Sequence, residues 1–168
     1  WELIAKTIRD VEDRYDGIVI VHGTDTMAYT SSAVSFMTLG LRKCVVFTGA
    51  QIPISKEGSD GRENLLDAVC TACSSGLTGV YVVFGGKIMP GCCVSKCDTE
   101  ARAAFQCINR REVGCVHQGK LRIFEYPSAP AGRPEWHIRV DNRVLLWKVT
   151  PGLSPDLLDA CIEARYKI

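Results

Sequence analysis

Hydrophobic positions near the start of the chain follow helical spacing. Ile4, Ile8, Val11 and Tyr15 recur every three or four residues, and charged residues occupy most of the positions between them. Apolar residues at this spacing fall on one side of a helix, so the pattern predicts an amphipathic helix over residues 2–15. The hydrophobic segments that follow have a different pattern.

Three short apolar runs, at residues 18–21, 44–48 and 80–84, contain almost no polar residues. Continuous runs of this length are typical of strands that are buried on both faces, as in a parallel sheet. Helical patterns separate them, one beginning near residue 24 and one over residues 62–73. The order strand, helix, strand, helix, strand predicts an α/β fold with right-handed crossovers.

The spacing within these two helical segments also indicates which residues face the core. The first helix is expected to bury Met27, Ser31, Val34, Met37 and Leu41. The second is expected to bury Leu65, Leu66, Val69 and Cys73.

Beyond the third strand the periodicity weakens, and turn residues become the main signal. Glycine and proline pairs at residues 85–86 and 90–91 flank a segment that we interpret as a hairpin. A polar helix is predicted over residues 99–105. Residues 126–134 hold three prolines and a glycine, a composition typical of a linker.

The remaining residues predict a strand at 144–147 and a helix with Ser154 as its N-cap and Pro155 at its first position. One strand and one helix do not make a core, so this segment looks like the beginning of another domain. We expect an N-terminal α/β domain over residues 1–125, with a parallel or mixed sheet between two layers of helices. A linker over 126–140 and the start of a second, smaller α/β domain over 141–168 would follow.

Charge and composition exclude several classes of function. Lys and Arg total 20 against 19 for Asp and Glu, so there is no excess of positive charge to attract nucleic acid or an anionic membrane. No apolar run is long enough to span a bilayer. Nine cysteines are an odd number, which argues against a fully paired disulfide framework and favours a reducing compartment. We therefore expect a cytoplasmic protein with no nucleic-acid or membrane partner.

The segment after the first buried strand carries polar groups that suit catalysis. In an open α/β sheet, ligands bind beyond the carboxyl ends of the strands, where Thr24 and Asp25 are placed. A Thr hydroxyl becomes a nucleophile when an oriented base removes its proton, and Asp25 is a candidate for the orienting group. By spacing alone, capping of the next helix is the more frequent role for both residues. His22 is a candidate base, although a His at such a turn is more often structural.

The identities of the residues indicate a function more specifically than their spacing does. Residues 17–27, Gly-Ile-Val-Ile-Val-His-Gly-Thr-Asp-Thr-Met, resemble the second signature of the asparaginase and glutaminase family that uses a Thr-Asp-Lys relay. The resemblance covers most of the chain and is closest over residues 17–70. It continues through residues 47–53, 59–61, 64–66, 94–96 and 149–154.

This resemblance implies a role for four residues. Thr24 would supply a catalytic hydroxyl, and Asp25 would lie beside it and hold the α-amino group of the substrate. Lys96 would act as the base, and the backbone carbonyl of Ala50 would face the substrate amide. The implied reaction converts L-asparagine to L-aspartate and ammonia through an acyl-enzyme on Thr, without a metal or an organic cofactor. The substrate would be asparagine, or also glutamine, and the protein a homo-oligomer, a dimer or a tetramer.

The chain departs from the family pattern at two places. Where relatives have Arg-Gly-Asn-Arg before a Thr-Lys pair, this chain has Pro-Gly-Cys-Cys-Val-Ser-Lys, ending at Lys96. The family's first signature, Thr-Gly-Gly-Thr-Ile, which supplies the primary nucleophilic Thr, has no counterpart in these residues. The chain also begins at Trp1, within the expected first helix, so we interpret it as an interior segment. We expect it to hydrolyse no amide by itself, and asparagine hydrolysis by the purified segment would contradict this expectation.

Three alternatives remain open. The same domain occurs in the ammonia-generating subunit of a tRNA-dependent amidotransferase, although the balanced charge argues mildly against contact with tRNA. A non-catalytic remnant that binds an acidic amino acid is the second alternative. The third is a zinc site among Cys70, Cys73, Cys92, Cys93 and Cys97. Because Cys70 and Cys73 lie one helical turn apart, we interpret them as packed thiols and expect no metal site.

Overall fold

The chain divides into two compact units, Trp1–Ile138 and Arg139–Ile168, which are described separately. The structure is a computed structural model that describes residues 1–74, 76–128 and 130–167. A bilayer-spanning helix is absent from this described part of the chain.

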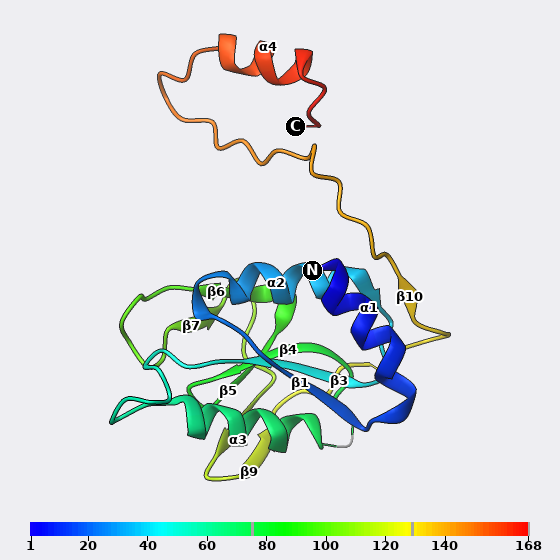
Figure 1. The fold of residues 1–168 in the computed structure, drawn as a ribbon, viewed down its shortest axis with the longest axis vertical. Helices are drawn as coiled ribbons and strands as arrows, with labels where there is room; N and C mark the ends of the chain where they lie inside the picture. Colours follow the sequence, from blue (N-terminus) through cyan, green and yellow to red (C-terminus); the bar gives the residue numbers. More distant parts are fainter. Residues whose placement is uncertain (75, 129, 168) are drawn as a thin grey trace. The chain divides into compact units, whose positions relative to one another are not determined.

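A six-stranded mixed sheet forms the centre of the first unit (Figure 1), with strands in the order β1-β3-β4-β5-β8-β9. The bounds are β1 Gly17–Val21, β3 Cys44–Thr48, β4 Gly79–Phe84, β5 Lys87–Pro90, β8 Gly114–His117 and β9 Lys120–Ile123. The first three strands are parallel, with Cys44 opposite both Gly17 and Gly79, and the others pair antiparallel. The predicted α/β fold with a mixed sheet is confirmed.

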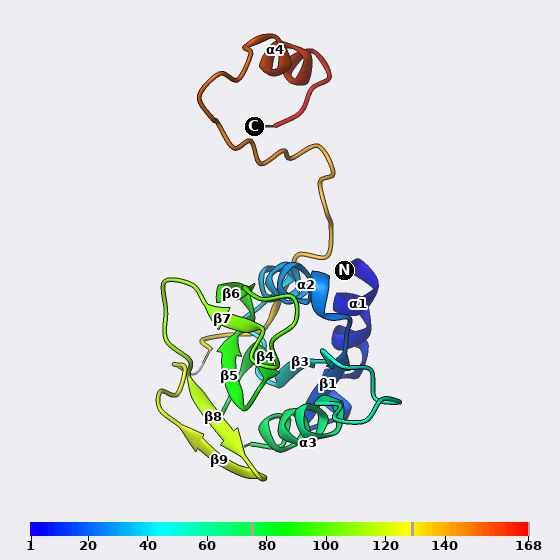
Figure 2. The ribbon, with the colours of Figure 1, turned by 90° about the vertical axis from the view of Figure 1, so that its left-hand side faces the viewer.

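Helices cover both faces of this sheet. α1 (Glu2–Val11), which continues as the 3-10 turn η1 (Glu12–Arg14), and α2 (Thr24–Met37) lie on one face, and α3 (Gly61–Ala72) lies on the other (Figures 1 and 2). Alternate residues of β3 point into two separate cores: Val45 and Phe47 pack on the side of α2, and Cys44 and Val46 on the side of α3. β3 is therefore buried on both faces, as its uninterrupted apolar run predicts.

The predicted inner face of α2 is confirmed, whereas that of α3 is wrong. The five residues predicted for the first helical stripe, Met27 to Leu41, are all buried, although α2 ends at Met37 and Leu41 lies beyond it. On α3 the predicted residues Leu65, Leu66 and Val69 are 38%, 59% and 44% exposed. The buried positions are instead Gly61, Asn64, Asp67, Ala68, Thr71 and Ala72. Small side chains face the sheet because the helix comes very close to it: a Cβ on Gly17 would lie 2.2 Å from the Ala72 carbonyl oxygen.

The segment after β4 differs from its prediction in two places. The segment between the two glycine and proline pairs is not a hairpin by itself: it forms one strand, β5, which pairs antiparallel with β4 across the turn at residues 85–86. The predicted helix over residues 99–105 is wrong, because η2 (Gly91–Cys93) leads into an antiparallel hairpin of β6 (Val94–Lys96) and β7 (Phe105–Cys107). At the turn, Oδ1 of Asp98 accepts the backbone N–H groups of Glu100 at 2.7 Å and Ala101 at 2.8 Å. These bonds hold a local turn and compete with a helix.

Residues 135 and 136, within the predicted linker, form a short strand of the first unit. This strand, β10 (Glu135–Trp136), pairs antiparallel with β2 (Thr38–Leu39), and His137 N–H donates to the Met37 carbonyl at 2.9 Å. The division into domains at residues 125 and 140 stays a prediction.

The second unit contains one helix in its described part, α4 (Asp156–Glu163), which confirms the helix predicted there. It begins one residue later than predicted, because Pro155 and not Ser154 is its N-cap. The hydroxyl of Ser154 accepts the N–H of Asp156 at 3.3 Å. The predicted strand over residues 144–147 is wrong: among the described residues, only an isolated bridge joins Val144 to Lys167. Pairing at a single residue does not make a ladder, and Leu146, inside the predicted strand, is 96% exposed.

Candidate active site

The loops after β1 and β3 place the first two residues of α2 at one edge of the sheet. His22 N–H donates to the Thr48 carbonyl at 2.8 Å, which keeps the chain beside β3 for one residue beyond β1. Gly23, in an extended conformation, is the residue before the helix, and Thr24 and Asp25 are its first two residues. Among the described residues, no side chain caps this helix terminus. The interpretation of Thr24 and Asp25 as caps is therefore wrong, and both side chains are available for other contacts.

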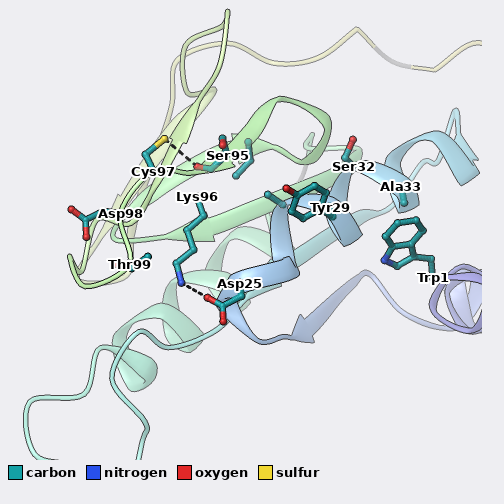
Figure 3. Close-up of a pocket in the computed structure, with 12 residues that line it drawn as sticks. Trp1, Asp25, Tyr29, Ser32, Ala33, Ser95, Lys96, Cys97, Asp98 and Thr99 are labelled. Carbon is teal, nitrogen blue, oxygen red and sulfur yellow. Dashed lines mark hydrogen bonds and ion pairs between the residues drawn. The ribbon is translucent and has the colours of Figure 1, made fainter. Parts of the chain in front are cut away.

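Lys96 provides these contacts. Its Nζ donates to Oγ1 of Thr24 at 2.8 Å. It also donates to Oδ1 of Asp25 at 2.7 Å (Figure 3). The Lys96 side chain is 13% exposed, whereas that of Asp25 is 90% exposed. Because Lys96 ends β6, the β6–β7 ladder fixes its backbone, and only the side chain crosses to α2. The structure thus brings together three of the residues that the resemblance singles out, and their roles stay predictions.

Ala50, the fourth such residue, lies in the loop after β3 and is not among the side chains that line the cleft around Lys96. The loop is held on one side by the Asp60 carboxylate, which accepts the N–H groups of Gln51 and Ile52 at 2.9–3.0 Å. The side-chain amide of Gln51 also donates to the carbonyl of Thr99, which lines the cleft. Ala50 therefore lies in a fixed loop that reaches the rim of the cleft, and the orientation of its carbonyl toward a substrate stays a prediction.

Asn64 joins three loops beneath the site. It is 2% exposed, and its Nδ2 donates to the Gly49 carbonyl at 3.0 Å and to Oδ2 of Asp60 at 2.9 Å. Its Oδ1 accepts the N–H of Gly85 at 3.0 Å. A buried amide with every one of these contacts made is stabilising and fixes the loops that it joins. Reasoning from apolar periodicity missed this residue, although polar residues four positions apart at 60 and 64 indicate a shared helical face.

A cleft of about 710 Å³ lies along α2 and the β6–β7 hairpin. Its volume falls in the range of small-molecule sites. The lining residues are Trp1, Asp25, Ala28, Tyr29, Ser32, Ala33, Val94, Ser95, Lys96, Cys97, Asp98 and Thr99. Asp25, Tyr29 and Ser32 recur at helical spacing, so the outer face of α2 forms one wall (Figure 3). Tyr29 and Ser32 are not among the residues predicted for the site, although their helical spacing from Asp25 is visible in the sequence.

Two carboxylates flank the Lys96 side chain in this cleft. Asp25 accepts from Lys96, and its second oxygen, Oδ2, makes no hydrogen bond with the residues that the structure describes. The backbone N–H groups of Ala101 and Glu100 lower the pKa of Asp98, and the charge of Lys96 lowers it further. Asp98 is therefore ionised at neutral pH. The cleft offers negative charge to a ligand with an ammonium group, beside a hydroxyl that is hydrogen-bonded to an amine.

His22 lies apart from this cleft. One ring nitrogen, Nδ1, is 2.7 Å from the Gly23 carbonyl oxygen, and the ring meets Phe47 edge-on at a centroid distance of 6.1 Å. Both contacts favour the structural role. For the zinc alternative, no group of three or more His, Cys, Asp or Glu side chains able to hold a metal occurs among the described residues.

Comparisons with known proteins agree with these observations. The family model for the N-terminal domain of asparaginase matches residues 1–129. The solved structure of the thermostable L-asparaginase from Thermococcus kodakarensis is 41% identical, with a TM-score of 0.92 over 98% of this chain and 50% of that chain. L-asparaginase 1 of Escherichia coli K12 is 37% identical over 163 residues, 94% of this chain and 47% of that protein. One component of the glutamyl-tRNA(Gln) amidotransferase of Aeropyrum pernix is 34% identical over 180 residues, 99% of this chain and 42% of that protein. This chain spans about half the length of the Thermococcus kodakarensis and Escherichia coli asparaginases.

Proposed function

Since this chain belongs to the asparaginase family, we propose that the full-length protein is an amidohydrolase that converts L-asparagine to L-aspartate and ammonia. The observation that carries the proposal is the contact of one amine, Nζ of Lys96, with both Oγ1 of Thr24 and Oδ1 of Asp25. A hydroxyl beside a base, with the base oriented by a third group, is the arrangement that nucleophilic catalysis on Thr requires.

The chemistry follows from these contacts. In its neutral form, Lys96 has a lone pair that accepts the proton of the Thr24 hydroxyl. Thr24 in turn accepts the proton of the nucleophilic Thr, whose oxygen attacks the carbonyl carbon of the side-chain amide. The carbon–nitrogen bond breaks as the proton passes from Lys96 to the leaving nitrogen, which departs as ammonia. Water then cleaves the ester to release aspartate. By the family resemblance, the primary nucleophile belongs to the Thr-Gly-Gly-Thr-Ile signature, and Thr24 with Lys96 forms the proton relay.

The charges around the relay support an amino-acid substrate. Asp25 uses Oδ1 for Lys96, and its exposed side chain leaves Oδ2 open to an α-ammonium group that can donate a hydrogen bond to it. Asp98, which lines the same cleft, adds a second negative charge. We assign the backbone carbonyl of Ala50 a contact with the substrate amide. The hydrogen bonds of Asp60 and Asn64 fix the loop that carries this carbonyl.

Ammonia release by the full-length protein tests the proposal. The wild type is compared on asparagine and glutamine with Lys96→Ala, Thr24→Ala and a matched control, Lys87→Ala. Lys87 is also a lysine on a neighbouring strand, but it pairs with Glu112 at 3.1 Å instead of with the relay. We expect both relay variants to lose at least about 10³-fold in kcat/KM and the control to keep its activity. An inert wild type would instead favour the non-catalytic binding protein, and active relay variants would exclude the assigned roles.

We further propose that the protein is a cytoplasmic homo-oligomer, a dimer or a tetramer, that needs no metal or organic cofactor. Nine cysteines without disulfide partners suit a reducing compartment. The oligomer rests on the family resemblance. Sedimentation of the full-length protein tests the oligomer, because a monomer at assay concentration would contradict it. Unchanged activity after dialysis against a chelator is expected, because an amine and a hydroxyl carry the proton transfer.

The second candidate is the ammonia-generating subunit of a tRNA-dependent amidotransferase. The observation in its favour is the 34% identity to the amidotransferase component of Aeropyrum pernix. The net charge of +1 gives the chain no general attraction for tRNA. Ammonia release that requires tRNA and a second protein would favour this candidate, whereas release from free asparagine alone favours the asparaginase.

A further inference from the structure

Cys92 and Cys93 are adjacent thiols at the point where η2 passes into β6. Their sulfur atoms lie 3.7 Å apart, so both side chains turn toward the same side of the backbone. Cys92 is exposed to solvent, and Cys93 is half-buried. The proposed hydrolytic chemistry uses neither thiol, although Lys96 follows only three residues after Cys93.

We propose that Cys92 and Cys93 form a reversible modification site that small disulfide compounds oxidise to an intramolecular disulfide. In the first step, the thiolate of Cys92 attacks one sulfur of the small disulfide RSSR. A bond forms between Cys92 and that sulfur, and the other half leaves as RSH. Cys93 then attacks the sulfur of Cys92, a Cys92–Cys93 bond forms, and the second RSH leaves. Two thiols are oxidised and one small disulfide is reduced to two thiols.

The geometry of the pair favours this order of steps. Cys92 is the thiol that solvent reaches, and it is the one that a disulfide in solution meets. Burial raises the pKa of Cys93, and the hydrogen bond and the charge of Cys92 raise it further. The last two causes disappear once Cys92 is part of a mixed disulfide. Cys93 then becomes a better nucleophile, and it is already beside the sulfur that it attacks.

Two of the neighbouring cysteines compete poorly. Burial raises the pKa of Cys107, which lies on β7 across the hairpin, to about 11. Burial also raises the pKa of Cys44, inside the core, to about 12. Because the thiolate is the reactive form, both remain thiols at neutral pH. Cys73, directly after α3, and Cys97, directly after β6, are also exposed to solvent, and both serve as internal references.

The product disulfide is expected to be easily reduced. The Cα atoms of adjacent residues are about 3.8 Å apart, which is below the usual range of about 4.4–6.8 Å for disulfides. Closing the ring brings the sulfur atoms from 3.7 Å to bonding distance and twists the intervening peptide. Strained disulfides are the labile ones that return to thiols under mild reduction.

This twist acts on the strand that carries Lys96. On one side, Gly91 is fixed, because its carbonyl accepts the Ser31 hydroxyl at 3.0 Å and an added Cβ would lie 2.9 Å from Oγ of Ser35. On the other side, the Cys93 carbonyl accepts the N–H of Ile108 at 2.7 Å, where the β6–β7 ladder begins. Because Gly91 is held in place, rotation of the Cys92–Cys93 peptide moves the Cys93 carbonyl. This movement weakens the hydrogen bond from Ile108 to that carbonyl, and with it the start of the β6–β7 ladder. The expected consequence for ammonia release rests on the proposed function, whereas the oxidation itself does not.

The test treats the full-length protein with oxidised glutathione and maps its peptides without reduction. We expect the peptide with Cys92 and Cys93 to lose two hydrogen atoms before Cys73 or Cys97 is modified, and dithiothreitol to restore it. Cys93→Ser removes the second thiol, so a glutathione adduct should persist on Cys92. Cys92→Ser should leave Cys93 unmodified over the same time.

Ammonia release is measured on the same samples. Oxidation is expected to lower it several-fold in the wild type, reversibly, and to leave the activity of the Cys92→Ser variant unchanged. A persistent adduct on wild-type Cys92, a Cys93–Cys107 bond, or faster modification of either reference cysteine would overturn the dithiol site. A complete disulfide with unchanged ammonia release would overturn its coupling to Lys96. Absence of ammonia release before oxidation would count against the proposed function alone, because the mass measurement does not depend on activity.

Discussion

Nζ of Lys96 lies 2.8 Å from Oγ1 of Thr24, although 72 residues separate the two in the chain. The β6–β7 hairpin holds one residue, and the first turn of α2 holds the other. Two regular elements thus set the distance between the hydroxyl and the amine, and neither atom belongs to a free loop. A site supported in this way keeps its geometry when one side chain is changed, which makes single substitutions informative.

Substitutions at Thr24 are expected to distinguish the role of its hydroxyl group from the role of its side-chain shape. Thr24→Val keeps the branched side chain but removes the group that Lys96 contacts, so kcat should fall by about 10²–10⁴-fold. Thr24→Ser keeps the hydroxyl and should retain most of the activity. Steady-state ammonia release by the full-length variants measures both. Equal losses for Val and Ser would show that packing, and not proton transfer, explains the importance of Thr24.

Removal of the buried amide at position 64 is expected to destabilise the fold. Asn64→Leu leaves the Gly49 carbonyl and the Gly85 N–H without their partner. Unsatisfied buried groups of this kind cost about 1–3 kcal/mol each, so the free energy of unfolding should fall by about 3 kcal/mol. Urea denaturation of the full-length protein measures it. The control is Arg62→Leu on the exposed side of the same helix, with an expected change within about 0.5 kcal/mol. A similar loss in both variants would exclude a special role for the amide network.

The pattern of apolar residues predicts the parallel strands well and the orientation of α3 poorly. A strand buried on both faces needs apolar residues at every position, and Val45, Val46 and Phe47 meet this requirement. On α3, the large apolar residues do not mark the inner face, because the close approach of the helix to β1 at Gly17 admits only small side chains. The distance between helix and sheet depends on how the layers pack. The pattern of residues along one helix carries no information about that distance.

The segment around Asp98 and the site itself depend on contacts that spacing does not show. Residues 99–105 have a helical composition, but the Asp98 carboxylate binds the next N–H groups and turns the chain into a hairpin. The meeting of Lys96 with Thr24 depends on that hairpin. Spacing alone favoured a cap at Thr24 and gave no role to Lys96, and the family resemblance was needed to pair them.

The correction on α3 leads to a third prediction. Ala68 is completely buried, and Leu66, two residues earlier, is 59% exposed. Ala68→Leu adds three carbons to a filled space between helix and sheet and should cost about 1–3 kcal/mol. Leu66→Gln should change the free energy of unfolding by no more than about 0.5 kcal/mol. Thermal and urea denaturation measure both. A large loss for Leu66→Gln would show that another surface covers α3 in the full-length protein.

The last prediction concerns Asp67, whose carboxyl group is buried in α3. Its Oδ2 has no hydrogen-bond partner among the described residues. Burial raises the pKa of Asp67, and the neighbouring Glu63 raises it further, while His117 lowers it. The unfolded chain, with its lower pKa, releases this proton first as pH rises. Between the two pKa values the unfolded state binds fewer protons, so the free energy of unfolding decreases as pH rises and stays lower above the folded pKa.

Asp67→Asn is expected to remove this decrease, because the amide does not ionise. The variant should therefore gain stability relative to the wild type as pH rises from acidic to neutral. Glu63→Gln keeps the Asp67 carboxyl but removes one cause of its raised pKa, so it should reduce the decrease without abolishing it. Urea midpoints at a series of pH values measure all three proteins. If the wild type and Asp67→Asn differ by a constant amount at every pH, then Asp67 is ionised with an ordinary pKa in the folded state, and burial does not control its charge.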